Sequence, residues 1–371
     1  MSDGYLDGLK ALPPVPPDVI DCALSELAGG FARLEALARA HPDEVRAFMT
    51  AGCAYGNEAL IGQIRDVYDI PPDVSVIPVG GTSAFALTLA TVSPGGLVLY
   101  EKPGYKPFGD AAGDLGFRTA PLPRDPAAGF AVDVDRLRAA ARDGCRLAVV
   151  STPSNPAGAE LSEDEVRAAA DALAAPGPRE SDPGLLVVDE TFVAPTAGRV
   201  RSLVNAAPNV AVVCSFSKGW GLAALRLGFV AVRPPFAVKI RNRWVSLFNA
   251  NGALAESLAT LALLHRGVFA GDYRRITDAN RAVLRAGVAR AGGRMICTVP
   301  AEGLTAWVDV PGVDPDVLAA DLLADAKVRV LSGALFGLPS GFRIGLGMAL
   351  DAQGNSSKFA EAVRRIVDHL A

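Results

Sequence analysis

The chain has 371 residues, of which 50% are hydrophobic and 20% are charged, and its formal net charge at pH 7 is −4. This length suits one large domain and a smaller one, with enough apolar residues for a sizeable core. The slightly acidic balance argues against nonspecific binding to nucleic acid and against an anionic membrane surface. No apolar run approaches the roughly 18–20 residues of a membrane span. We therefore expect neither nucleic acid nor a membrane as a partner.

Cysteines and histidines are few and scattered along the chain. The five cysteines include no CxxC pair, which is typical of reduced thiols, and the opening residues lack the pattern of a signal peptide. We therefore expect a cytoplasmic protein. The three histidines, His41, His265 and His369, lie far apart in the sequence and lack the spacing of zinc ligands. We expect no metal.

The first half of the chain begins with a proline-rich segment that predicts an extended arm. Residues 18 to about 39 carry apolar side chains at helical intervals, which predicts a helix. From about residue 75, short apolar runs alternate with helix-like segments, which indicates a mostly parallel sheet with crossover helices. One such helix, Ser162–Ala174, begins with a capping box of Ser162 and Glu165. The apolar runs are Val74–Val79, Gly96–Tyr100, Leu147–Ser151, Leu185–Val188, Val210–Cys214 and Gly228–Val232.

Beyond about residue 271 the pattern changes to that of a smaller α+β domain. The predicted elements are helices Tyr273–Ala291, Asp314–Ala326 and Ser356–His369 and strands Thr305–Val310, Val328–Leu331 and Phe342–Leu346. We predict an N-terminal arm and helix at residues 1–50, which packs on the small domain. A large domain at 51–268 and a small C-terminal domain at 269–371 complete the predicted organisation.

Three of the predicted strands end in polar, reactive residues. Ser151-Thr-Pro-Ser-Asn155-Pro-Ala-Gly follows one strand, Asp189-Glu190 follows the next, and Ser215-Phe-Ser217-Lys218 follows the third. Ligands of open α/β sheets bind outside the carboxyl ends of the strands, so these residues are expected to converge. A lysine flanked by hydroxyls and by a second cation suits an aldehyde cofactor that carries a phosphate. Its amine can form a Schiff base, because desolvation lowers the pKa of a lysine.

The order and spacing of these motifs, with Arg226 eight residues after Lys218 and Gly228 following, resemble the fold-type I pyridoxal-phosphate enzymes of the class I/II aminotransferase family. The resemblance covers essentially the whole chain from about residue 50. It implies an α/β fold, in which a large domain with a mostly parallel seven-stranded sheet is followed by a smaller α+β C-terminal domain. It also implies pyridoxal 5'-phosphate as the cofactor and amino-group transfer between an α-amino acid and a 2-oxo acid through a Lys218 Schiff base.

The resemblance assigns roles around the cofactor ring and the substrate. Lys218 and Asp189 are catalytic, since Lys218 moves protons and Asp189 keeps the ring nitrogen protonated. Tyr105, in Pro103-Gly-Tyr105, stacks on the ring and is the third catalytic residue that the resemblance implies. Asn155 donates to the ring's phenolate oxygen and also lies beside the substrate. Arg343, in Gly341-Phe-Arg-Ile-Gly-Leu-Gly347, binds the substrate α-carboxylate with its guanidinium fork.

The same resemblance predicts a phosphate site. A glycine-rich entry to a helix presents free backbone N–H groups to an anion, and Ser215, Ser217 and Arg226 add hydroxyls and a cation. The residues at the helix entry are Gly81, Thr82 and Ser83. Tyr55 matches a tyrosine that reaches the phosphate in the neighbouring subunit. This match implies a homodimer with shared active sites.

Two departures from the family pattern leave alternatives open. Phe192 stands where many relatives have a tyrosine that donates to the phenolate oxygen. Ser332 stands where relatives often have proline, and it either contacts substrate or satisfies its own backbone.

The same first chemical steps also serve a lyase, a cyclase or an oxidase acting on an amino acid. A cofactor-binding DNA regulator is disfavoured, because residues 1–50 are too short and too weakly basic for a DNA-binding module. The substrate side chain is expected to meet the N-terminal arm, the loop after Gly52 and Phe248–Asn251.

Overall fold

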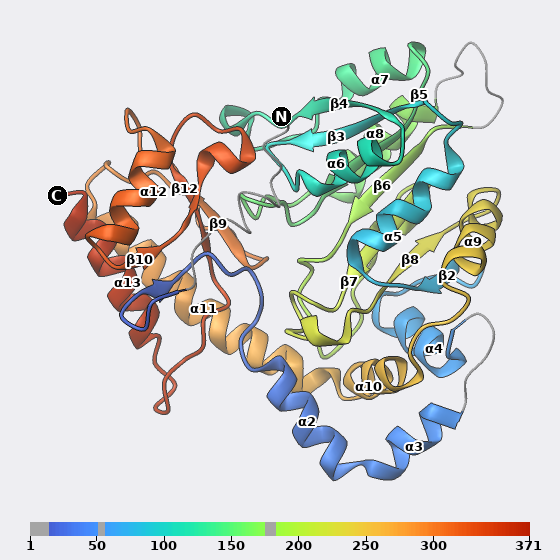
Figure 1. The fold of residues 1–371 in the computed structure, drawn as a ribbon, viewed down its shortest axis with the longest axis horizontal. Helices are drawn as coiled ribbons and strands as arrows, with labels where there is room; N and C mark the ends of the chain where they lie inside the picture. Colours follow the sequence, from blue (N-terminus) through green and yellow to red (C-terminus); the bar gives the residue numbers. More distant parts are fainter. Residues whose placement is uncertain (1–14, 51–55, 175–182) are drawn as a thin grey trace.

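The computed structural model describes residues 15–50, 56–174 and 183–371. Its larger part is built around a seven-stranded sheet with the strand order β2-β8-β7-β6-β5-β3-β4 (Figure 1). All neighbouring strands run parallel except β8, which is antiparallel to both β2 and β7. The strands are β2 (Ser75–Pro78), β3 (Leu97–Lys102), β4 (Arg118–Pro123), β5 (Cys145–Ser151), β6 (Leu185–Asp189), β7 (Val210–Ser215) and β8 (Gly228–Val232). The predicted mostly parallel seven-stranded sheet is therefore confirmed.

Helices cover both faces of this sheet, and this explains the continuous apolar runs of its central strands. Every residue of β5, β6, β7 and β8 is buried. In β5, Leu147 and Val149 pack on one face, whereas Ala148 and Val150 pack on the other. The first face is covered by α5 (Gly81–Thr88), α6 (Pro107–Asp114) and α9 (Phe236–Leu247). The second face is covered by α2 (Gly30–Ala40), α4 (Glu58–Val67), α7 (Val134–Arg142), α8 (Glu163–Ala174) and α10 (Ala253–Leu264).

Strand β4 was missing from the expected strands, because its sequence contains no continuous apolar run. It is an edge strand that pairs only with β3, and most of its side chains are exposed or half-buried. Two prolines, Pro121 and Pro123, lie in it. Proline is tolerated at a sheet edge, where the missing N–H costs no ladder hydrogen bond.

The C-terminal part has its own core and a three-stranded antiparallel sheet of order β11-β12-β9. The three strands of this sheet are β9 (Thr305–Val308), β11 (Leu331–Ser332) and β12 (Phe342–Gly345), and a further strand of the C-terminal part, β10 (Val328–Arg329), lies outside it. The helices of this part are α11 (Arg266–Arg290), α12 (Pro315–Ala324) and α13 (Ser357–His369). Helix α11 joins the two parts, since Phe269 packs into the larger core and Leu284 into the smaller one. The predicted boundary at residue 268 falls within the first turn of this helix.

The N-terminal segment differs from the expected helix over residues 18–39. Only α2 is helical, and it begins at Gly30, after Gly29 with a φ of 81°. Upstream, β1 (Ile20–Asp21) pairs in parallel with β10, and the carbonyl oxygen of Cys22 accepts a 2.8 Å hydrogen bond from the backbone N–H of Gly345. Backbone pairing with the C-terminal part therefore overrides the helical spacing of this stretch.

The N-terminal segment also contacts more than the small C-terminal part. Strand β1 lies against that part, as expected for residues 1–50. Helices α2 and α3 (Pro42–Thr50) instead pack against α10 of the larger part, and Leu34 of α2 belongs to the larger core. The expectation that the whole segment packs on the small domain is therefore wrong for its helices, because their apolar side chains meet α10.

Within the described ranges, no single helix has both the length and the apolar composition needed to cross a membrane. Helices α10 and α11 meet these criteria only as a pair, and the pair is bent by 73°.

Candidate active site

A cavity of 640 Å³ lies at the carboxyl ends of β5, β6 and β7, between the two parts of the molecule. Its walls come from the N-terminal segment, the large sheet and the C-terminal part. The cavity brings together the predicted residues Gly81, Tyr105, Asn155, Asp189, Ser215, Ser217, Lys218, Arg226 and Arg343. Ser83 lies in the first turn of α5 but is exposed and does not line the cavity. Thr82 contributes its backbone to that turn, and Tyr55 lies outside the described residues.

Lys218 follows β7 by three residues and is mostly buried in the cavity wall. Burial lowers the pKa of its ammonium group, Arg343 and Arg226 lower that pKa further, and Glu26 raises it. The backbone N–H of Leu27 donates to the carbonyl oxygen of Lys218 over 3.1 Å, which fixes the loop that carries the lysine. A lowered pKa increases the neutral fraction of an amine, and the neutral amine is the nucleophile.

Asp189 is the last residue of β6, and only 8% of its surface is exposed. Burial raises the pKa of its carboxyl group to about 6, against the hydrogen bonds from Thr191, and the negative charge of Glu101 raises it further. Among the described residues, none of the groups that shift the pKa of Asp189 is a cation. A protonated ring nitrogen would supply the missing positive charge, so the residue fits the pyridine ring of pyridoxal phosphate.

The start of α5 lies against the end of β7, where the sequence predicted the phosphate site. Ser215 Oγ donates to Ser217 Oγ over 2.9 Å and accepts from the backbone N–H of Ser217 over 3.2 Å. A Cβ atom at Gly80 would lie 2.5 Å from the carbonyl oxygen of Arg226, and one at Gly81 would lie 3.6 Å from Ser215 Oγ. The helix entry therefore touches both the serine pair and Arg226. Free N–H groups, hydroxyls and a guanidinium fit a phosphate dianion.

Arg343 closes the cavity from strand β12 of the C-terminal part and is 3% exposed. Its Nη1 donates to Oδ1 of Asn155 over 3.0 Å, and its Nη2 donates to the carbonyl oxygen of Ala23. Tyr105 is half-buried and packs edge-on against Phe108, with ring centroids 5.2 Å apart. The guanidinium, the amide and the aromatic ring thus line the cavity that also contains Lys218.

The cavity also contains residues that were not assigned from the sequence. Ser25 and Glu26 line it from the N-terminal segment, as does Arg329 from β10. Arg329 donates from Nε to Asp21 Oδ1 over 3.1 Å, which joins the N-terminal strand to the C-terminal part. The expected contribution of the N-terminal arm is thus present. No local sequence signal marked Arg329, because its position depends on the pairing of β1 with β10.

The stretch Phe248–Asn251 does not line this cavity, contrary to expectation. The side chain of Asn251 donates instead to the carbonyl oxygen of Pro78 over 2.9 Å and to Glu256 Oε1 over 2.8 Å. Phe248 follows α9 and is 39% exposed.

Of the two residues that depart from the family pattern, Phe192 lies in the cavity wall and Ser332 does not. Phe192 lines the cavity and packs in an apolar cluster with Leu27, Tyr273, Ile276 and Leu304. Ser332 does not line the cavity. Its hydroxyl donates to Asp316 and accepts from the backbone N–H of Ala334 over 3.1 Å, so it satisfies local groups at the start of a short helical turn.

Comparisons with known proteins find relatives that cover most of the chain. The family model described as aminotransferase class I and II matches residues 24–366. A histidinol-phosphate aminotransferase of an Anaeromyxobacter species is 31% identical over 333 residues, covering 87% of this chain and 83% of the relative. Another, from Symbiobacterium thermophilum, is 28% identical over 307 residues, covering 81% of this chain and 78% of the relative.

Solved structures share the fold over nearly the whole chain. A PLP-dependent aminotransferase from Streptococcus suis superposes with a TM-score of 0.83 at 18% identity, covering 100% of this chain and 97% of the other. An aminotransferase from Mycobacterium tuberculosis superposes with a TM-score of 0.80 at 24% identity, covering 99% and 94%. The extent of the family match, together with the conjunction of Lys218, Asp189 and Arg343 in one cavity, shows that this chain belongs to the class I and II aminotransferases, enzymes that transfer amino groups with pyridoxal phosphate.

Proposed function

We propose that the chain moves an amino group from an amine that carries a neighbouring anionic group to a 2-oxo acid, with Lys218 as the covalent and proton-moving residue. The observation that carries this proposal is that Lys218 and Arg343 line one cavity with Asp189. The guanidinium fork of Arg343 would bind the anionic group, and this contact fixes the amine-bearing carbon relative to Lys218.

Each remaining residue would have a defined task. When bound, pyridoxal phosphate supplies an aldehyde for amines and a ring that withdraws electrons from the adjacent carbon. Asp189 would hold a proton on the ring nitrogen, and Asn155 would donate its amide N–H to the phenolate oxygen. Tyr105 would cover the ring face. Lys218 Nζ would take the proton from the amine-bearing carbon and return it on the cofactor side.

The phosphate of the cofactor would be held by backbone N–H groups of Gly81, Thr82 and Ser83, by the hydroxyls of Ser215 and Ser217, and by Arg226. Support for this role comes from the close approach of the α5 entry to Arg226 and Ser215. Ser215 and Ser217 are buried, and burial strengthens a charge-assisted hydrogen bond from their hydroxyls, whereas Arg226 is exposed in the single chain.

Histidinol phosphate is a specific candidate substrate. The two curated relatives described above are both histidinol-phosphate aminotransferases, and their substrate carries a phosphate where an amino acid carries a carboxylate. A guanidinium binds either group. Glu26 lines the same cavity, and its carboxylate would be able to accept a hydrogen bond from an N–H-bearing side chain such as imidazole. Ordinary α-amino acids bound through Arg343 are the other candidates.

We also propose a homodimer in which Tyr55 reaches the phosphate of the neighbouring subunit. Seven large apolar side chains exposed in this single chain fall between residues 238 and 268: Val238, Val245, Leu247, Phe248, Leu254, Leu264 and Val268. These residues lie on α9, α10 and the start of α11 or directly after α9, and exposed apolar side chains on these helices support a subunit interface. A cytoplasmic location remains a prediction that is based on the scattered cysteines.

Borohydride reduction of the holoenzyme tests the covalent assignment. Peptide mass spectrometry is expected to find the cofactor label on Lys218 and to find none in Lys218→Ala, whereas Lys102→Ala keeps the label. A label on another lysine would overturn the assignment.

A substrate panel then tests the reaction. The holoenzyme is given 2-oxoglutarate with histidinol phosphate or with each of the common amino acids, and the products are quantified. Transfer predicts one glutamate formed for each donor consumed. Release of ammonia, carbon dioxide or peroxide without glutamate would instead indicate a lyase, decarboxylase or oxidase.

A further inference from the structure

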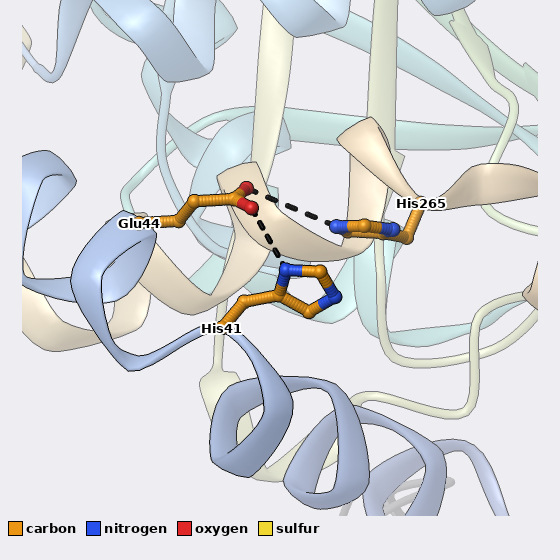
Figure 2. Close-up of side chains that lie close together, drawn as sticks. All are labelled: His41, Glu44 and His265. Atoms are coloured by element: carbon orange, nitrogen blue, oxygen red, sulfur yellow. Dashed lines mark hydrogen bonds and ion pairs between the residues drawn. The ribbon is translucent and has the colours of Figure 1, made fainter.

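Three side chains with metal-binding atoms meet at a corner of the fold outside the cavity around Lys218 (Figure 2). His41 directly follows α2, Glu44 lies in the first turn of α3, and His265 lies at the junction of α10 and α11. One nitrogen of each histidine and a carboxylate oxygen of Glu44 all lie within 4.8 Å of one another. The spacing of histidines along the chain predicted no metal site, but the packing of α2 and α3 against α10 brings two of the three histidines together.

In Figure 2 the carboxylate of Glu44 faces both imidazole rings. His41 Nδ1 is 2.8 Å from Glu44 Oε1, and His265 Nε2 is 3.8 Å from Glu44 Oε2. The second distance is too long for a hydrogen bond. Both Glu44 Oε2 and His265 Nε2 are buried, and neither has a hydrogen-bond partner among the described residues. Buried polar atoms of native proteins are nearly always satisfied, and a cation between these two atoms would satisfy both.

The surroundings favour a cation over two protonated histidines. The imidazole centroids are 4.4 Å apart, and two imidazolium ions at this separation would repel each other. Neutral imidazoles are the form that binds metals.

We propose that His41 Nδ1, Glu44 and His265 Nε2 bind one divalent transition-metal ion, for which Zn²⁺ is the best fit. Two imidazoles and a carboxylate are a known zinc donor set, with a fourth position left for solvent. Ligand atoms about 2.0–2.2 Å from a tetrahedral metal lie roughly 3.3 Å apart. The observed separations of 2.8 Å and 3.8 Å lie on either side of this value. One ligand atom of each residue lies within 4.8 Å of the others, so side-chain rotations would bring the three atoms to these distances.

The ion would act as a clamp on the N-terminal segment. The side chains of His41, Glu44 and His265 are 34%, 37% and 26% exposed, so the ion can enter from solvent. At the other end of α2, a Cβ atom at Gly30 would lie 2.3 Å from the carbonyl oxygen of Trp220, two residues after Lys218. Helix α2 thus connects the metal corner to the loop that carries the lysine. Bound metal would hold this helix, and with it Ser25 and Glu26, in position.

Metal binding by the tag-free, chelator-treated holoenzyme tests the proposal. Isothermal titration with Zn²⁺ is expected to give one ion per chain, and Co²⁺ is expected to produce the visible absorption of a tetrahedral site. Zn²⁺ should also raise the melting temperature by several degrees. In Glu44→Gln and His265→Asn we expect at least 100-fold weaker Zn²⁺ binding, no cobalt spectrum and no thermal shift.

His369→Asn is the matched control, because His369 is the remaining histidine and is exposed at the end of α13. It should bind Zn²⁺ as the unchanged protein does. Cofactor absorbance verifies the folding of each variant, and two separate ligand substitutions keep the test valid if one of them fails to fold. Absence of Zn²⁺ binding in the unchanged protein, or full binding in both ligand variants, would overturn the proposal and leave a simple histidine–carboxylate ion pair.

Discussion

Arg343 Nη1 donates a hydrogen bond to Asn155 Oδ1 over 3.0 Å, although the two residues are 188 positions apart in the chain. The contact joins strand β12 of the C-terminal part to the loop after β5 of the large sheet. The other end of the same guanidinium donates to the backbone of Ala23 in the N-terminal segment. One side chain therefore connects all three segments that surround the cavity, and it orients the group that is expected to bind substrate.

Arg343→Lys is expected to raise the KM of amines that carry an anionic group. The reaction of amines that lack such a group should change much less. Lysine keeps the charge but loses the planar fork that binds a carboxylate or phosphate through two hydrogen bonds. Loss of about 1.5–3 kcal/mol of charge-assisted hydrogen bonding corresponds to roughly 10- to 150-fold in KM. Steady-state kinetics with both kinds of amine measure the difference.

Arg364→Lys is the control for that substitution, because Arg364 lies on the exposed side of α13 and pairs with Glu361. Its kinetics should match those of the unchanged enzyme. An unaltered KM in Arg343→Lys would contradict the assigned substrate contact.

Phe192→Tyr is expected to lower the pH at which the cofactor absorbance of the holoenzyme changes. Phe192 lines the cavity and is 6% exposed, so a tyrosine hydroxyl there would be able to donate to the phenolate oxygen. Such a donor stabilises the deprotonated form and therefore lowers the apparent pKa. A spectroscopic pH titration measures the shift, with the exposed Phe31→Tyr as control. An unchanged titration curve would mean that residue 192 does not act on the cofactor.

Gly80→Ala is expected to destabilise the protein by about 1–3 kcal/mol through overpacking and to weaken cofactor binding. The added Cβ would meet the carbonyl oxygen of Arg226 at 2.5 Å, which forces the start of α5 away from the backbone of Arg226. Gly62→Ala is the matched control. It lies within α4, and a Cβ there meets nothing within 4 Å, so alanine should stabilise the helix by up to about 1 kcal/mol. Urea unfolding and cofactor titration compare the two variants, and equal effects would argue against the close approach.

Glu190→Gln is expected to reduce the pH dependence of stability in the cofactor-free protein. Burial raises the pKa of the Glu190 carboxyl group to about 7, from an ordinary value of 4.5, against hydrogen bonds from Leu203 and Ser202. The folded state therefore binds the proton more tightly than the unfolded state. The resulting stabilisation is complete below about pH 4.5 and is lost as the pH rises to about 7. The loss is on the order of 3 kcal/mol.

Urea unfolding across that pH range measures the effect. The unchanged protein should lose stability as the pH rises, and Glu190→Gln should lose less. Asp189 contributes to the remaining slope, since burial also raises the pKa of its carboxyl group, to about 6. Glu361→Gln is the control, because hydrogen bonds from Arg364 and Arg365 lower the pKa of Glu361 to about 2, so it stays ionised throughout. Identical slopes in the unchanged protein and Glu190→Gln would refute the prediction.

Local sequence patterns predicted the central strands and several helix ends because these depend on near neighbours. Strands buried on both faces must be apolar along their whole length, so β5 to β8 were visible as runs. The capping box before α8 is also present, since Glu165 N–H donates to Ser162 Oγ and Ser162 N–H donates to Glu165 Oε2. In contrast, residues 18–29 had helical spacing, but Ile20 and Asp21 pair with β10, a contact that no local pattern encodes.

The sequence by itself determined which residues stand at the ends of the parallel strands, and thereby the chemistry of Lys218, Asp189 and Asn155. Parallel strands end at one sheet edge, so a linear pattern was sufficient to predict that these residues meet. Only the tertiary structure decided that Glu26 and Arg329 line the cavity and that His41, Glu44 and His265 meet at a distant corner. Such contacts depend on how helices and chain segments pack across long separations, and packing leaves no periodic signal in the sequence.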